Sequence, residues 1–180
     1  MTEEWNIPME SGLDIPAVLA RLKPYNLSPI ERVLAAHTGA VQLLLSLYFG
    51  SPVDVTLVEQ SEEMGEIRRR ASLVVSGTGQ EACFARSVIP LSANNREVLA
   101  GVREGKLGLG QVAVKHRIPT ERRIREITVT PRQICRKYIM QGPGLYYAVT
   151  EMFPRDLYRV ETQRPPLKPD RWAQAVKVGV

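Results

Sequence analysis

From residue 53 onward, the chain consists of short runs in which apolar and polar residues alternate, separated by turn sequences. Alternation with a period of two predicts strands. We expect six of them, at residues 53–57, 67–75, 81–89, 121–130, 133–140 and 145–153. Turns such as Ser76-Gly77-Thr78-Gly79 connect neighbouring runs directly. Strands in hairpin-linked groups predict an α+β domain built on an antiparallel sheet of about six strands.

Helical patterns precede and interrupt these runs. We expect helices at residues 14–23, 29–49 and 92–104, and a short one after the glycine-rich turn at 105–110. The sequence Ser28-Pro29-Ile30-Glu31 has the cap, the first-turn proline and the early acid that are typical of a helix start. His37-Thr38-Gly39 is a poor helix interior, so we expect a break there before an apolar helix resumes over 41–48.

At 180 residues, the chain has the length of one domain that can bury a core of its own. We therefore expect a single domain over 1–180, with helices flanking the sheet. Residues 1–13 are predicted to form an N-terminal arm. Residues 155–180 are polar and rich in proline, which predicts a C-terminal tail that wraps the surface and is anchored by Trp172.

The net charge of +5 invites a nucleic-acid interpretation, and the runs 68–70 and 122–125 supply clusters of arginine. No helix-turn-helix, zinc-finger or RNP-like pattern accompanies them, and only 6% of the residues are aromatic, which leaves few stacking platforms. A basic balance also attracts a small dianionic metabolite. We therefore expect no nucleic-acid partner, and no membrane partner because no apolar run is long enough to cross a bilayer.

Most familiar catalytic patterns are missing. The two cysteines, Cys83 and Cys135, and the two histidines lack the close spacings of zinc sites, so no metal site is expected. Both cysteines lie in strand-like stretches, which is typical of reduced thiols in a cytoplasmic protein. The turn at 105–110 meets neither the Walker nor the Rossmann spacing. We interpret it as a flexible turn whose backbone N–H groups approach another group.

One acid interrupts the apolar face of the last predicted strand. Glu151 stands at an alternation position within the run 145–153, where successive positions of one parity share a face. That face otherwise holds Leu145, Tyr147, Val149 and Phe153. A carboxylate there needs a cationic or hydrogen-bonding partner, or a proton. Glu151 is therefore a candidate acid or base; the alternative is a strand-end residue that reaches water.

Arginines on strand faces are the second kind of candidate. Arg86 alternates with apolar residues in a strand that looks central, so we expect it on a buried or half-buried face with an anionic partner, either a substrate or a structural acid. Arg68 and Arg70 share one face of their strand and Arg69 lies on the other, so at least one of the three should point inward. The planar guanidinium fork suits a substrate carboxylate.

Eight stretches of the sequence carry a resemblance to a known family. They are Leu27-Ser28-Pro29, 34–42, Arg69-Arg70, 85–90, 107–110, Arg136-Lys137-Tyr138, 149–153 and 169–172. In this order and spacing they resemble the chorismate lyase (chorismate pyruvate-lyase) family, in particular its actinobacterial branch that forms 4-hydroxybenzoate. The stretches are spread from residue 27 to residue 172, which is nearly the whole chain.

The resemblance implies an antiparallel sheet flanked by helices, with an enclosed ligand pocket. It also implies conversion of chorismate to 4-hydroxybenzoate and pyruvate without a metal or organic cofactor. By motif position, Arg70 and Glu151 are the expected catalytic residues, with Arg70 at the ring carboxylate and Glu151 at the opposite end of the ring. Further substrate contacts are implied for Arg86, Leu109, Gly39 and Val41. Hairpin length leaves open whether Arg69 or Arg70 enters the pocket.

The main alternative is a non-catalytic domain that binds a small aromatic carboxylate, because the fold resembles the ligand-binding half of some transcriptional regulators. We favour the enzyme, since only about two dozen residues precede the first matching helix, too few for a DNA-binding domain. The pattern of residues leaves several points open: the 3-hydroxy or 4-hydroxy isomer of the product, the proton donor and acceptor, the pathway that uses the product, and the oligomeric state.

Overall fold

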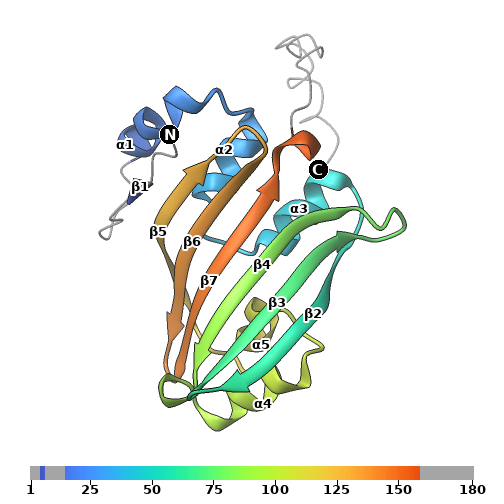
Figure 1. The fold of residues 1–180 in the computed structure, drawn as a ribbon, viewed down its shortest axis with the longest axis vertical. Coiled ribbons are helices and arrows are strands. Elements are labelled where there is room, and N and C mark those ends of the chain that lie inside the picture. The colour runs from blue at the N-terminus through green and yellow to red at the C-terminus, as the bar shows by residue number, and fades with distance from the viewer. Residues whose placement is uncertain (1–4, 7–14, 159–180) are drawn as a thin grey trace, which may run out of the picture.

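The structure, a computed structural model, describes residues 5–6 and 15–158. It is an α+β fold in which helices pack on one antiparallel sheet (Figure 1). Most of the predicted arm over 1–13 and of the predicted tail over 155–180, including Trp172, lies outside the described residues. The arm, and the tail beyond residue 158, therefore stay predictions.

The sheet contains six long strands and one short strand. The long strands are β2 (Val53–Glu63), β3 (Glu66–Val75), β4 (Glu81–Pro90), β5 (Glu121–Val129), β6 (Gln133–Gly142) and β7 (Leu145–Pro154). The short β1 (Trp5–Asn6) pairs with β5 at one edge, and the strand order is β1-β5-β6-β7-β4-β3-β2 with antiparallel neighbours throughout. Two three-stranded meanders thus meet where β4 pairs with β7. The predicted α+β class and antiparallel sheet are confirmed.

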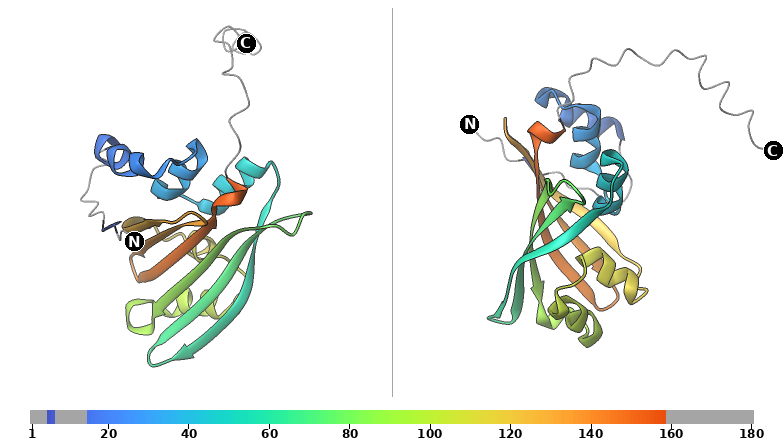
Figure 2. Two further views of the ribbon diagram at one scale, coloured as in Figure 1. Left: turned by 45° about the horizontal axis from the view of Figure 1, so that its top comes forward. Right: turned by 90° about the vertical axis from the view of Figure 1, so that its right-hand side faces the viewer.

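The part of the chain that the structure describes contains five α-helices. They are α1 (Ile15–Leu22), α2 (Pro29–Ala36), α3 (Val41–Phe49), α4 (Arg96–Glu104) and α5 (Leu109–Lys115). Figure 2 shows that they lie on one side of the sheet and that no described helix covers the opposite face, which we call the bare outer face. The hydrophobic core therefore lies between the helices and this inner face. None of these helices is both long and apolar enough to cross a membrane.

The helix boundaries near residue 30 follow from local sequence. The Ser28 hydroxyl accepts a hydrogen bond from the Glu31 backbone N–H at 3.3 Å, and the Glu31 carboxylate accepts one from the Ser28 N–H at 2.6 Å. These two bonds form a capping box at the start of α2. Because α2 ends at Ala36 and α3 begins at Val41, the predicted helix break is confirmed.

Strand β2 extends well beyond its predicted end. It continues to Glu63 and turns into β3 at Met64 and Gly65, whose φ angles are 51° and 80°. The second half of β2 is mostly polar and acidic and shows no apolar alternation. This composition fits its position, since β2 is an edge strand with much of both faces exposed. Alternation of apolar and polar residues reveals a strand that buries one of its two faces. It therefore misses a strand that buries neither face.

The residues that follow β7 belong to the folded core. The Nε of Arg155 donates to Oε1 of Glu31 at 2.6 Å, and both side chains are buried. Tyr158 is also buried, and its hydroxyl donates to the carbonyl of Ala82. At residues 155–158 the structure thus differs from the predicted surface tail, because an ion pair and an aromatic ring hold this segment against the domain.

Candidate functional site

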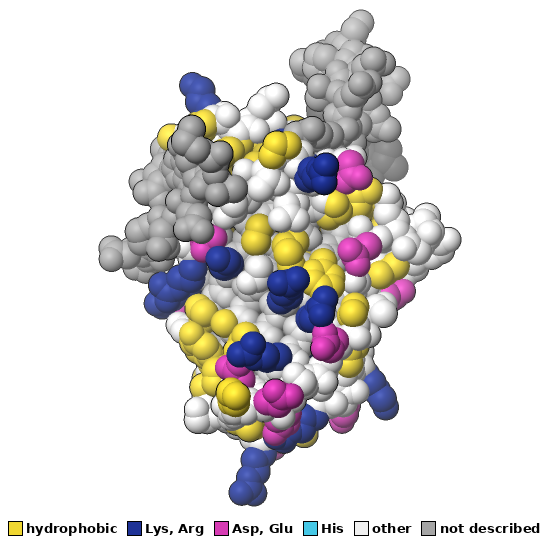
Figure 3. Space-filling model, in the orientation of Figure 1, with side chains coloured by type: hydrophobic (Ala, Val, Ile, Leu, Met, Phe, Trp, Pro, Cys, Tyr) yellow, Lys and Arg dark blue, Asp and Glu magenta, His cyan; other side chains and the backbone are white. Residues whose placement is uncertain are grey.

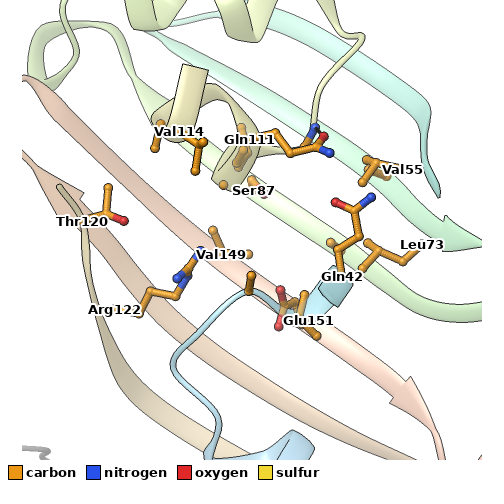
Figure 4. A pocket seen from close by; sticks show the side chains of 18 of the residues that line it. Gln42, Val55, Leu73, Ser87, Gln111, Val114, Thr120, Arg122, Val149 and Glu151 are labelled. Atoms are coloured by element: carbon orange, nitrogen blue, oxygen red, sulfur yellow. Dashed lines mark hydrogen bonds between the residues drawn. The ribbon is translucent and has the colours of Figure 1, made fainter. Parts of the chain in front are cut away.

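A cavity of about 350 Å³ lies between the inner face of the sheet and the segments that cover it. Strands β2 to β7 supply its floor, and its cover comes from residues 39–42 and from α5 with the turn that precedes it. Figure 4 shows apolar side chains such as Val55, Leu73 and Val149 around the cavity. The polar side chains in its wall are those of Gln42, Arg69, Ser87, Gln111, Thr120, Arg122, Tyr138 and Glu151. Its size lies at the lower end of the range for small-molecule sites.

Glu151 lies on the inner face of β7 and is only 3% exposed. The residues at alternate positions from Leu145 to Phe153 are all buried with it, which confirms that it shares the apolar face of the strand. Its Oε2 atom accepts a hydrogen bond from Nε of Arg136 at 2.7 Å, and the ion pair brings Nη2 of Arg136 to 2.6 Å from the same oxygen. Its Oε1 atom accepts one from the Tyr138 hydroxyl at 2.9 Å. Glu151 is therefore a buried, paired carboxylate, and it does not reach water at a strand end.

Arg136, the partner of Glu151, is 1% exposed and connects the sheet to α2. Its Nη1 atom donates to the carbonyl of Leu34, at 2.8 Å, and to the carbonyl of His37. These carbonyls stand at the C-terminal end of α2, where the helix dipole is negative. The guanidinium thus has a carboxylate on one side and a helix end on the other. Arg136 and Glu151 neutralise each other's charge.

Arg69 lies on the inner face of β3, and no described residue supplies a counter-ion for its side chain. It is 3% exposed, and its Nη2 atom donates to the Leu107 carbonyl at 2.7 Å. Its Nη1 atom is buried without a hydrogen-bond partner, and in residues 5–6 and 15–158 no carboxylate pairs with it. Burial lowers the pKa of Arg69, yet an arginine keeps its charge in proteins. Arg69 is therefore a buried cation in the cavity wall.

Arg122 reaches the same cavity from the inner face of β5, at the other side of the sheet. Its Nη1 atom donates to the Thr38 carbonyl at 3.1 Å, and within the described parts of the chain it makes no ion pair. Its Nη2 atom lies against α5, because a Cβ built on Gly110 would be 3.1 Å from it. Arg122 therefore contacts both covering segments, the 37–40 loop and α5.

Five of the seven residues proposed from the sequence line this one cavity. They are Glu151, Arg69, Leu109, Gly39 and Val41. The cavity brings together residues that are far apart in the chain, as an assembled site requires. Of the two adjacent arginines, it is Arg69 that enters the cavity.

Arg70 and Arg86 do not line this cavity, and the structure corrects the placement expected for both. They lie on the bare outer face of the sheet, seen in Figure 3, where basic side chains cross the middle of the face. Arg70 pairs with Glu59 at 2.7 Å. Arg86 is exposed. The guanidinium carbons of Arg70 and Arg86 each lie 5.7 Å from the ring centroid of Phe84. The apolar neighbours that suggested burial of Arg86 are covered in part by the arginines themselves.

Two comparisons set the chain beside known proteins. No protein-family model matches the chain. None of the curated proteins compared with it gives a match either. The resemblance to chorismate lyases therefore stays a prediction from the quoted motifs, and the function has to be inferred from the chemistry of the cavity.

Sequence reasoning missed the roles of Arg136 and Arg122. Arg136 carried a detectable signal, because it alternates with Ile134, Tyr138 and Met140 on an apolar strand face, as Glu151 does on the next strand. Pairing these two anomalies across neighbouring strands would have found the ion pair. Arg122 was harder to find, because β5 has an irregularity in register between Ile124 and Glu126 that interrupts its alternation.

Proposed function

We propose that this protein binds chorismate in the cavity and eliminates its enolpyruvyl group to give 4-hydroxybenzoate and pyruvate. The observation that carries the proposal is Arg69, a buried guanidinium in the wall that also holds Glu151; the Nη1 atom of Arg69 finds no partner among the described residues. A buried charge without a partner is costly, so the site is suited to an anionic ligand that supplies one. The motif resemblance suggests which anion this is.

In this proposal the ring carboxylate of chorismate pairs with Arg69, and the ring lies on the apolar wall near Val149. The ring hydroxyl, para to the carboxylate, then points towards Glu151. The Oε1 atom of Glu151 accepts one hydrogen bond from Tyr138, and a carboxylate oxygen has room to accept a second. The segments that contain Gly39, Val41 and Leu109 cover the ligand and enclose it.

The elimination removes the hydrogen on the hydroxyl-bearing ring carbon and breaks the ether bond at the neighbouring ring carbon. The C–H electron pair becomes the new ring double bond, which makes the ring aromatic. The ether electrons leave with the enolpyruvyl group as the enolate of pyruvate. The methylene carbon of that group takes the proton, so atoms and electrons balance without an oxidant or a reductant.

Glu151 is better suited to holding the ring hydroxyl than to removing a proton. Its Oε2 atom already accepts a hydrogen bond from Nε of Arg136 and lies 2.6 Å from Nη2 of the same guanidinium, so only Oε1 is left to contact the substrate. Burial, together with the charge of Glu151, raises the pKa of Tyr138 well above its ordinary 10.0, so the phenol keeps its proton at neutral pH. We therefore assign the role of proton acceptor to the substrate's own methylene carbon, which the cavity holds near the C–H bond.

The second candidate function is a non-catalytic receptor for an aromatic carboxylate. The observation in its favour is the Arg136–Glu151 pair. This ion pair is complete without a ligand, and it leaves Glu151 poorly placed for acid–base chemistry. A receptor of this kind would use Arg69 and the apolar wall in the same way. It differs from the lyase only in what happens to chorismate after binding.

One assay separates the two functions. Purified protein is mixed with chorismate, and pyruvate and 4-hydroxybenzoate are quantified over time beside a sample without protein. The lyase produces both in equal amounts, faster than the spontaneous decay of chorismate. A receptor binds chorismate or 4-hydroxybenzoate in calorimetry and leaves chorismate intact, and that outcome would replace the lyase proposal. The identity of the hydroxybenzoate also determines which ring isomer is formed.

A further inference from the structure

Within residues 5–6 and 15–158, two positive charges in the cavity wall have no carboxylate partner. Arg136 neutralises Glu151, whereas neither Arg69 nor Arg122 pairs with a carboxylate in the described part of the chain. We propose that Arg122 is the receptor for a second carboxylate, so that the cavity selects small cyclic dianions over monoanions. This inference rests on the proposed function, in which Arg69 holds the ring carboxylate.

Neighbouring titratable groups leave this charge count unchanged. His37 stands at the end of α2, close to both Arg136 and Arg122. Burial, followed by the charge of Arg136, lowers its pKa below the ordinary 6.5, so its imidazole is neutral at pH 7. Tyr138 is neutral as well, as argued above. Among the residues that the structure describes, the unpaired charge in the wall is therefore that of two arginines, and a ligand with two negative charges balances it.

The positions of the groups match a ligand with two separated carboxylates. Arg69 lies on β3 and Arg122 on β5, which are four strands apart, and Glu151 lies midway between them on β7. Figure 4 shows the side chains of Arg122 and Glu151 directed into the same space from their two strands. A ring held between Arg69 and Glu151 can therefore carry a side arm towards Arg122. In chorismate that arm is the enolpyruvyl ether, which ends in a carboxylate.

Arg122 is also placed to couple ligand binding to the cover of the cavity. Only its Nη1 contact with the Thr38 carbonyl is present, so most of its five N–H donors are left for a bidentate carboxylate. The same guanidinium lies against Gly110 at the start of α5. A carboxylate on Arg122 thus binds where the 37–40 loop and α5 meet. The product 4-hydroxybenzoate lacks this carboxylate, so it loses the Arg122 contact and leaves more readily.

A binding experiment with unreactive ligands tests this inference separately from turnover. Calorimetry compares 3-(carboxymethoxy)benzoate, a dianion with an ether-linked second carboxylate, with 3-ethoxybenzoate, a monoanion of similar shape. We expect wild-type protein to bind the dianion about 10-fold more tightly or better, since a charged hydrogen bond contributes roughly 1.5–3 kcal/mol. Arg122→Gln should abolish that preference by lowering the affinity for the dianion far more than that for 3-ethoxybenzoate, whereas Arg122→Lys should retain part of the preference.

The control is Arg123→Gln, which changes the next residue on β5. Arg123 is exposed and pairs with Glu121 at 3.0 Å, so its replacement should leave the preference intact. Equal affinity of the wild type for the two ligands, failure to bind either one, or a parallel loss of both in Arg122→Gln with unchanged circular dichroism would each overturn the inference. A preserved dianion preference without chorismate turnover would instead overturn only the lyase proposal.

Discussion

Arg69 and Arg70 are consecutive residues whose guanidinium groups lie on opposite faces of the sheet. Arg69 is 3% exposed in the wall of the cavity. The Arg70 side chain is 48% exposed and pairs with Glu59 on the outer face. This arrangement provides a matched pair of variants, because the same substitution at neighbouring positions of β3 affects either the cavity or the bare surface.

Replacing Arg69 by methionine should stabilise the ligand-free protein. Arg69→Met keeps an unbranched apolar stem and removes a buried charge that has no counter-ion in the described part of the chain. We therefore expect the free energy of unfolding to rise by about 1 kcal/mol or more. Urea unfolding followed by circular dichroism measures the change. A loss of stability greater than that of Arg70→Met would mean that Arg69 is a structural residue with its charge already satisfied.

Removing one charge of the Arg136–Glu151 pair should have the opposite effect and destabilise the protein. Arg136→Met leaves Glu151 as an uncompensated buried carboxylate, and we expect a loss of roughly 3–5 kcal/mol in unfolding free energy. The double variant Arg136→Met/Glu151→Leu removes both charges and should recover a large part of that loss. A double-mutant cycle from urea unfolding gives the coupling. Additive effects of the two single changes would contradict the description of this pair as mutually neutralised.

Lowering the pH should decrease the free energy of unfolding, because Glu31 takes up a proton. Burial raises the pKa of Glu31, but the hydrogen bond and charge of Arg155 and the hydrogen bonds with Ser28 together lower it below the ordinary 4.5. A folded-state pKa below the unfolded value means that this stabilisation is complete above pH 4.5 and is lost as the pH falls below it. Unfolding free energies of the wild type and Glu31→Gln, compared from pH 7 to pH 3, should converge at the acid end. A constant difference would exclude Glu31 as the titrating group.

Gly39→Ala should disturb the cover of the cavity and leave the sheet intact. A Cβ at residue 39 would lie 2.7 Å from Cε1 and 2.9 Å from Nε2 of His37, so the loop or the imidazole must move. We expect several-fold weaker binding of 4-hydroxybenzoate, measured by calorimetry. The control is Gly77→Ala in the β3–β4 hairpin, where a Cβ meets nothing within 4 Å. Its positive φ of 83° makes alanine strained there, so stability should fall without a change in ligand affinity.

Much of this fold follows from local patterns in the sequence. Alternation located the strands with one buried face, the Ser28–Glu31 box marked the start of α2, and poor helix residues marked the break before Val41. Alternation also placed Glu151 on the inner face of its strand. These features depend on neighbours in the chain, so a single sequence is enough to reveal them.

The part of the site that the sequence does not reveal depends on which face of the sheet the helices cover. Alternation separates Arg69 from Arg70 but does not say which of them points inward, because only packing against α5 and the 37–40 loop decides that. Arg86 has apolar neighbours on its face, yet that face is open to solvent. The partner of Glu151 lies on the adjacent strand, in a register set by the turn between β6 and β7.

The central claim is that the protein eliminates pyruvate from chorismate in the cavity that Arg69 lines, and paired kinetics test it most directly. The measurement is kcat/KM for release of pyruvate and 4-hydroxybenzoate by the wild type, Arg70→Gln and Arg69→Gln. We expect Arg70→Gln to match the wild type and folded Arg69→Gln to fall by roughly 100-fold or more, the effect of removing one partner of a buried charge pair. Absence of both products with the wild type, or equal activity of the two variants, would contradict the claim.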